Sequence, residues 1–179
     1  MYILTQNDLL LEKLLEFYNK DNNFDKMLNI ITGNSKISLR IIDWFVTNYA
    51  KKYFTIYNVN DVRIKVFESY KLMLKAYSKK RFDPFCRWKR ISIPYNETQY
   101  IQTTIGQLNF FKWAIQNKII EYIEKNLYVI EKDMNLCNNS RSKQNKKDLQ
   151  TTRKKREELS VSACRSIKRE YVDIEIDFK

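Results

Sequence analysis

The side chains best placed for chemistry in this sequence are cations separated by aromatic rings. The run SKKRFDPFCRWKR at 78–90 holds six Lys or Arg residues together with the rings of Phe82, Phe85 and Trp88. Such cations can each reach a phosphate of a polynucleotide, and binding gains from the release of condensed counterions. The rings can stack on unpaired bases at about 1–3 kcal/mol each. We therefore predict nucleic-acid contacts at Lys75, Lys79, Lys80, Arg81, Arg87, Trp88, Lys89 and Arg90.

A second basic cluster lies between residues 141 and 169. The contacts predicted there are Arg153, Lys154, Lys155, Arg156, Arg165, Lys168 and Arg169. Neither cluster contains an RNP motif or a C₂H₂ finger, so the pattern predicts anion binding without base-specific recognition and leaves DNA and RNA both open. The first cluster is also compatible with a solvated hairpin face whose rings point inward. The second is also compatible with a solubilising loop or a basic localisation run, TRKKREE.

The overall charge favours the same class of partner. The chain carries 33 Lys and Arg residues against 21 Asp and Glu residues, a formal net charge of +12. This excess indicates nucleic acid first and an anionic membrane surface second. Asn, Lys, Ile and Tyr are all abundant, so an AT-rich gene is an alternative source of the lysines.

Enzymatic readings find little support in the residue types. The chain has no histidine, the commonest general base and metal ligand. With only Gly33 and Gly106, no glycine-rich phosphate cradle can be built. The three cysteines, Cys86, Cys137 and Cys164, are far apart, which disfavours a zinc site and fits a reducing compartment.

One group of acids near the end of the chain could hold a metal. In YVDIEIDF the acids Asp173, Glu175 and Asp177 share one face of a predicted strand, and on the other face lie Ile174, Ile176 and Phe178. A strand with one solvated face gives the same pattern without catalysis. We predict a protein that is not an enzyme and that uses no metal and no cofactor.

Hydrophobic periodicity predicts helices in the first third of the chain. Residues 6–20 have helical spacing, with Asn7 or Asp8 as candidate cap, and MLNIIT at 27–32 reads as a short strand or a helix end. Residues 38–53 form an amphipathic helix that Ser38 caps.

The middle of the chain predicts antiparallel strands. Residues 54–59 and 62–67 alternate as a hairpin, and 68–77 favour a further strand over a short helix. The run at 78–90 is then a bend between strands, with a second hairpin from 90–95 and 99–104. The long helix predicted at 104–134, with a possible break near Asn126, is expected to bury Phe110, Phe111 and Trp113.

These elements predict an α+β fold. A small antiparallel sheet of roughly four to six strands packs against the 38–53 and 104–134 helices. Residues 1–134 form the core, 135–158 a basic flexible loop, and 159–179 a C-terminal helix and strand that dock onto the core. The sequence shows no signal peptide and no apolar run long enough to span a membrane.

Four runs of the sequence resemble a small protein family of the nucleocytoplasmic large DNA viruses, the giant viruses. These runs are ISLRIIDWFVTNYAKK at 37–52, KAYSKKRFDPFCR at 75–87, TTIGQLNFFKWAI at 103–115 and LSVSAC…VDIEIDF at 159–178. The resemblance carries no catalytic residue. It implies a virus protein that is not secreted and works in the viral factory of the host cytoplasm or in the virion.

We therefore expect a basic, non-enzymatic viral protein that binds nucleic acid, in late transcription or genome packaging. The alternative is a structural or interaction component of the virion whose basic face meets an acidic partner, such as another viral protein.

Overall fold

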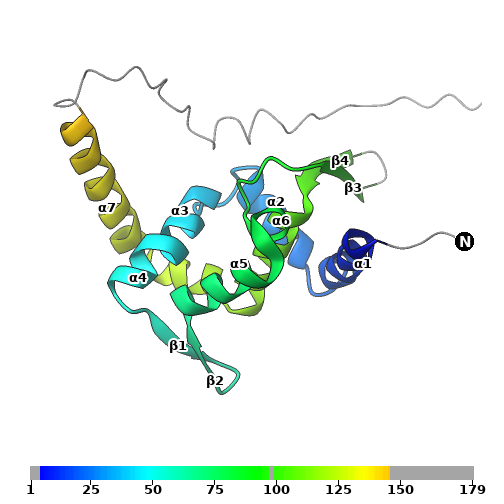
Figure 1. The fold of residues 1–179 in the computed structure, drawn as a ribbon, viewed down its shortest axis with the longest axis horizontal. Helices are drawn as coiled ribbons and strands as arrows, with labels where there is room; N and C mark the ends of the chain where they lie inside the picture. The colour runs from blue at the N-terminus through cyan, green and yellow to red at the C-terminus, as the bar shows by residue number, and fades with distance from the viewer. Residues whose placement is uncertain (1–4, 97–98, 146–179) are drawn as a thin grey trace, which may run out of the picture.

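The computed structural model describes residues 5–96 and 99–145, and it confirms the α+β class. Helices make up most of this part, and two short hairpins extend from them (Figure 1). The predicted C-terminal helix and strand, and residues 146–158 of the predicted loop, lie outside the described residues.

Two helices begin the described part: α1 (Gln6–Tyr18) and α2 (Asn23–Ile31). The N-cap of α1 is Thr5, whose hydroxyl oxygen accepts a hydrogen bond from the backbone N–H of Asp8. In return, the Asp8 carboxylate accepts the backbone N–H of Thr5 at 2.9 Å. This capping box corrects the prediction that Asn7 or Asp8 would be the cap. The 27–32 run is the end of α2, the helical one of the two predicted alternatives.

The predicted 38–53 helix is present with an irregular centre. It comprises α3 (Leu39–Trp44), a π-helical turn η1 (Phe45–Tyr49) and α4 (Ala50–Lys52). As predicted, the Ser38 hydroxyl caps it, by accepting the N–H of Ile41. The predicted apolar face is buried at Ile41, Ile42, Phe45 and Val46.

Both predicted hairpins form, but they do not join into one sheet. β1 (Ile56–Val59) pairs with β2 (Val62–Lys65), and β3 (Arg90–Asn96) pairs with β4 (Gln99–Thr104), both antiparallel. The hairpins lie at opposite ends of the view in Figure 1. The prediction of a single sheet of four to six strands is therefore wrong for the described residues.

The reason is the segment between the hairpins, which is α5 (Val66–Phe82) and not the strand we favoured for 68–77. Tyr70, Met73, Leu74 and Tyr77 face the interior at the i, i+3, i+4, i+7 spacing of a helix, whereas Leu72 is exposed. The strand was predicted because the apolar residues at 70, 72, 74 and 76 also recur at every second position, as in a strand.

The predicted 104–134 helix is two helices, α6 (Ile105–Gln116) and α7 (Ile119–Asn145). They separate at Asn117 and at Lys118, whose φ of 51° is left-handed. The predicted break at Asn126 is also present, as a non-helical residue within α7. Because α7 continues to Asn145, residues 135–145 are helical, which corrects the first part of the loop predicted for 135–158.

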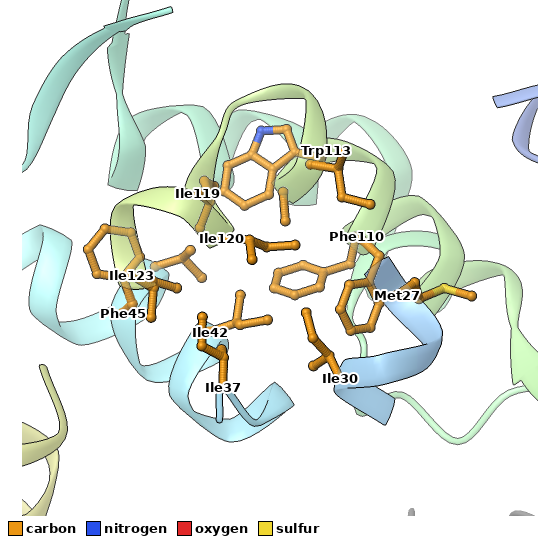
Figure 2. Close-up of a cluster of buried hydrophobic side chains, with 14 of the residues drawn as sticks. Met27, Ile30, Ile37, Ile42, Phe45, Phe110, Trp113, Ile119, Ile120 and Ile123 are labelled. Atoms are coloured by element: carbon orange, nitrogen blue, oxygen red, sulfur yellow. The ribbon is translucent and has the colours of Figure 1, made fainter. Parts of the chain in front are cut away.

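The core lies among α2, α3, η1, α6 and α7, where Met27, Ile42, Phe45, Phe110 and Ile123 meet (Figure 2). Phe110, Phe111 and Trp113 are all buried, as predicted. Aromatic rings extend this core toward α5: Phe82 lies edge-on to Phe110 and Trp113, at centroid distances of 5.8 and 5.7 Å.

Candidate nucleic-acid interface

Residues 79–90, which we call the basic segment, run from the last turn of α5 to the first residue of β3. α5 changes direction at Ser78, whose φ of 64° and ψ of 165° are not helical. The segment therefore connects a helix to a strand, which corrects the prediction of a bend between two strands.

The backbone of the basic segment is fixed against α6. Phe82 is fully buried, and the Asn109 side-chain amide donates to the carbonyl of Arg81 at 3.0 Å. A Cβ atom on Gly106 would lie 3.0 Å from the carbonyl oxygen of Asp83, so only glycine allows this approach without a shift. The cations of the segment thus extend from a backbone held in place by the core.

The position of Phe82 removes one predicted contact. We expected the rings of Phe82, Phe85 and Trp88 to be available for stacking, and Phe82 is not, because it packs in the core. Trp88 is 38% exposed, and the ammonium of Lys80 lies 4.0 Å from its ring centroid. This cation–π contact joins the end of α5 to the residues that precede β3.

Most predicted cations of the basic segment are exposed, and one is not free. Lys79, Lys80, Arg87, Lys89 and Arg90 all lie at the surface, and the described part of the chain shows no ion pair between them and a carboxylate. Arg81, by contrast, is half-buried.

Its guanidinium is engaged with α1. The Nε atom of Arg81 donates to Asn7 Oδ1 at 2.8 Å, and its Nη1 atom donates to Gln6 Oε1 at 3.2 Å. These bonds leave Arg81 fewer free donors for a phosphate. We therefore assign it a role in holding α1 to the basic segment.

Further cations line the exposed side of α5. Lys75, which was predicted as a contact, and Lys71 lie one helical turn apart, and both are exposed. Lys71 and Lys51 of α4 each lie over the Phe67 ring, at 5.5 and 5.6 Å. Lys51 was not predicted in this role, because the sequence gives no signal for it beyond a position late in the 38–53 helix.

The second predicted cluster lies outside the described residues. Its members are Arg153, Lys154, Lys155, Arg156, Arg165, Lys168 and Arg169. Among the predicted contacts, the structure therefore describes only those between residues 75 and 90.

A surface hollow of about 530 Å³ between α4 and α7 was not predicted either. Its lining includes Lys52, Tyr53, Val129, Asp133 and Leu136. The Asp133 carboxylate accepts hydrogen bonds there from the Lys52 ammonium, the Trp44 indole and the Tyr53 hydroxyl, at 2.5, 3.2 and 3.2 Å. The Lys52 ammonium offsets the charge of this carboxylate, and the exposed Lys132 adds a further cation to the lining.

The described residues also lack two features that would indicate other functions. No group of three or more His, Cys, Asp or Glu side chains gathers there as a metal site would require. Among the same residues, no helix has the length and apolarity needed to cross a bilayer.

Comparison with known proteins supplies the family. A family model described as a family of unknown function, DUF7197, matches residues 2–179. The chain is 46% identical over 136 residues to an uncharacterized protein of Acanthamoeba polyphaga mimivirus, a match that covers 70% of this chain and 52% of the relative. The chain thus spans about half the length of that curated relative. No solved structure matches this chain significantly.

Proposed function

This chain belongs to the DUF7197 family, an uncharacterised family of giant-virus proteins, and we propose that it is a non-enzymatic nucleic-acid-binding protein. One observation carries the proposal. The basic segment presents Lys79, Lys80, Arg87, Lys89 and Arg90 at the surface from a backbone fixed on α6, together with a partly exposed Trp88 whose ring Lys80 contacts.

The chemistry of these groups suits a polynucleotide. Exposed ammonium and guanidinium groups neutralise phosphates and release counterions, which makes binding strongly dependent on salt. Arg87 and Arg90 can each hold a phosphate through two parallel N–H donors. A fixed backbone lowers the ordering cost of binding.

Trp88 points to single strands as the preferred ligand. Its ring can stack on a base only where that base is not already stacked in a duplex. The Lys80 ammonium lies over one face of the ring, at 4.0 Å, so a base stacks on the other face or displaces this ammonium. We therefore expect single-stranded DNA or RNA to bind more tightly than a duplex of equal length.

The test is a salt titration of binding to single- and double-stranded DNA and RNA of one length. For the wild type we expect log K to fall linearly with log salt concentration, by about 0.7 for each phosphate neutralised on a single strand. The Lys79→Glu/Lys80→Glu/Arg87→Glu variant should lose both affinity and about two units of this slope.

The matched control is Lys13→Glu/Lys26→Glu/Lys125→Glu, which changes the net charge equally at exposed positions of α1, α2 and α7. It should keep most of the wild-type slope. If both variants lose affinity equally, the attraction is a property of the net charge and not of the basic segment.

A second variant separates stacking from charge. Trp88→Ala should weaken single-strand binding by about 1–3 kcal/mol, with little change of the salt slope, and Trp88→Phe should lose less. An unchanged affinity in Trp88→Ala would remove the ring from the proposal.

In an infected cell, we place this binding in late transcription or genome packaging, in the viral factory of the host cytoplasm or in the virion. If the wild type shows no salt-dependent binding to any of the four nucleic acids, the proposal fails. A structural role, in which the basic face meets an acidic protein of the virion, then takes its place.

A further inference from the structure

The β1–β2 hairpin has two different faces. On one face Tyr57 and Val59 pack against the body: the Tyr57 ring stacks on Tyr122 at 5.0 Å, and its hydroxyl donates to the carbonyl of Asn117 at 2.8 Å. Val62 and Ile64 pair with Val59 and Tyr57, so they belong to this face. The opposite face of β2 presents the exposed cations Arg63 and Lys65.

The outer edge of β2 has no strand beside it within residues 5–96 and 99–145. Val62, at the start of that edge, is 61% exposed although it belongs to the apolar face. A strand edge offers unpaired N–H and C=O groups that can pair with another extended segment. An isolated two-stranded hairpin is also marginally stable, and a third strand would strengthen it.

The chain itself contains a segment whose pattern matches this edge. Residues 171–178, YVDIEIDF, lie outside the described part, and in sequence they alternate between apolar and acidic side chains. The apolar set is Val172, Ile174, Ile176 and Phe178, and the acidic set is Asp173, Glu175 and Asp177.

We propose that residues 171–178 pair along the outer edge of β2 as the third strand of this sheet. Side chains alternate between faces in every strand, so a single register can place the apolar side chains of 171–178 on the apolar face and its acids on the basic face. The apolar set then lies beside Val62 and Ile64, and the acids lie beside Arg63 and Lys65. Cross-strand pairs of opposite charge and of apolar side chains both stabilise such a sheet. Lys65 already contacts Glu68 at 3.2 Å, and Arg63 has no ion pair with a carboxylate in the described chain.

The other hairpin is a poorer acceptor for this segment. β3 contains Pro94, which has no N–H to donate to an added strand. The side chains on its solvent face include Ser92, and Arg90 is its one cation. An acidic strand would find one opposite charge there and two on β2.

The length of the intervening chain permits the contact. Twenty-five residues separate Asn145 from Tyr171. Fully extended, they span at most about 80–90 Å, whereas a compact domain of this size has a radius of gyration of about 15 Å. The segment can therefore reach β2 from the end of α7 whichever path it takes.

Hydrogen exchange of the full chain tests the proposal. In the wild type, β2 amides that point away from β1 should be protected, and Ile174→Asp/Ile176→Asp should speed their exchange about tenfold or more. The β2 amides that point toward β1 serve as an internal control and should change much less. If the outward amides exchange at the rate of unprotected amides in the wild type, the proposal is overturned.

A charge exchange provides the matched test. Arg63→Glu/Lys65→Glu should remove the protection, and adding Asp173→Lys/Glu175→Lys should restore it. The control Lys71→Glu/Lys75→Glu, with the same change of charge on exposed α5 positions, should leave it intact. If adding Asp173→Lys/Glu175→Lys to Arg63→Glu/Lys65→Glu does not restore protection, these acids do not lie beside Arg63 and Lys65.

Dilution distinguishes the chain's own segment from that of a second copy. Protection that is unchanged over a hundredfold range of protein concentration supports the intramolecular strand, and protection lost on dilution overturns it in favour of exchange between copies. None of these experiments contains nucleic acid, so their outcomes are independent of the proposed binding function.

Discussion

Two aspartates, Asp43 within α3 and Asp133 on the neighbouring α7, show how differently this molecule treats a carboxylate withdrawn from water. Asp133 of α7 is 8% exposed and meets three donors on or beside that helix. Burial alone would raise its pKa, but these hydrogen bonds outweigh burial and hold the pKa below the usual 3.8. Asp43 of α3 is also largely withdrawn from solvent, and burial, together with the nearby Asp83, raises its pKa to about 6.

The contrast shows that the donors around a carboxylate, and not its burial, decide whether it stabilises this fold near neutral pH. Asp133 joins α7 to α3 and α4. Asp43 remains charged at neutral pH in surroundings that disfavour the charge. The following predictions test this contrast, beginning with the largest expected effect.

Asp133→Ala should lower the free energy of unfolding at pH 7 by about 1.5–3 kcal/mol, chiefly because the Trp44 indole loses its carboxylate acceptor. The loss of the Lys52 partner adds little, because that side chain is 55% exposed and water can replace the carboxylate. Urea denaturation followed by circular dichroism measures the loss. Asp133→Asn retains one acceptor oxygen and should lose less. A loss below about 0.5 kcal/mol in Asp133→Ala would show that the three bonds contribute nothing.

Asp43→Asn should raise the free energy of unfolding at pH 7 by about 1–3 kcal/mol, because the amide stays neutral in the same surroundings. The folded protein holds the Asp43 proton up to a pH of about 6, and the unfolded chain releases it near 3.8. The contribution of Asp43 to stability therefore declines as pH rises between these values and is constant above them.

Urea titrations from pH 4 to pH 8 check this sign. The difference in unfolding free energy between Asp43→Asn and the wild type should grow from pH 4 to pH 6 and then level off. A difference that shrinks over this interval would mean that the folded state favours the Asp43 carboxylate, in conflict with its assigned environment.

Trp44→Phe should cost about 1 kcal/mol, because it removes one donor to Asp133 and keeps most of the ring. It should also move the pKa of Asp133 upward. The stability that Asp133 contributes is present above 3.8 and is lost as pH falls through its lower folded pKa. A carboxyl-carbon NMR titration of Asp133 in both proteins measures the shift, and an unchanged pKa would show that the indole does not hold the charge.

Tyr53→Phe should have the smallest effect, about 0.5 kcal/mol, because the Tyr53 ring is half exposed and water can replace its hydroxyl. Thermal unfolding of the variant beside Trp44→Phe gives the comparison. If Tyr53→Phe proves the more damaging of the two, the order of the donors around Asp133 is wrong.

Local periodicity in the sequence was sufficient for the elements whose partners are near in the chain. The Ser38 cap, both hairpins and the burial of Phe110 and Trp113 all follow from spacings of a few residues. The segment 68–77 was misread because its apolar residues satisfy a strand period and a helix period together. Tertiary packing of Tyr70 against Phe82 and Trp113 favours the helix.

Features that join distant residues were not predictable in this way. The exposure of Lys79, Lys80 and Arg87 was predictable from their charge. The hydrogen bond of Arg81 to Asn7 was not, because it joins positions 74 residues apart. The sequence also could not decide that Phe82 would pack inside and Trp88 outside, because both rings lie between cations.

The π-helical turn at Phe45–Tyr49 absorbs one residue within the helix, because the N–H of Ala50 bonds to the carbonyl of Phe45 five positions back. Removing Asn48 would make this the four-residue bond of a regular α-helix, and Lys52 would keep nearly its present direction toward α7. A deletion in the regular turn of α3 would instead rotate everything after it by about 100° about the axis and carry Lys52 away from Asp133. The alignment of α4 with Asp133 therefore tolerates the loss of a residue within the π-helical turn and not before it.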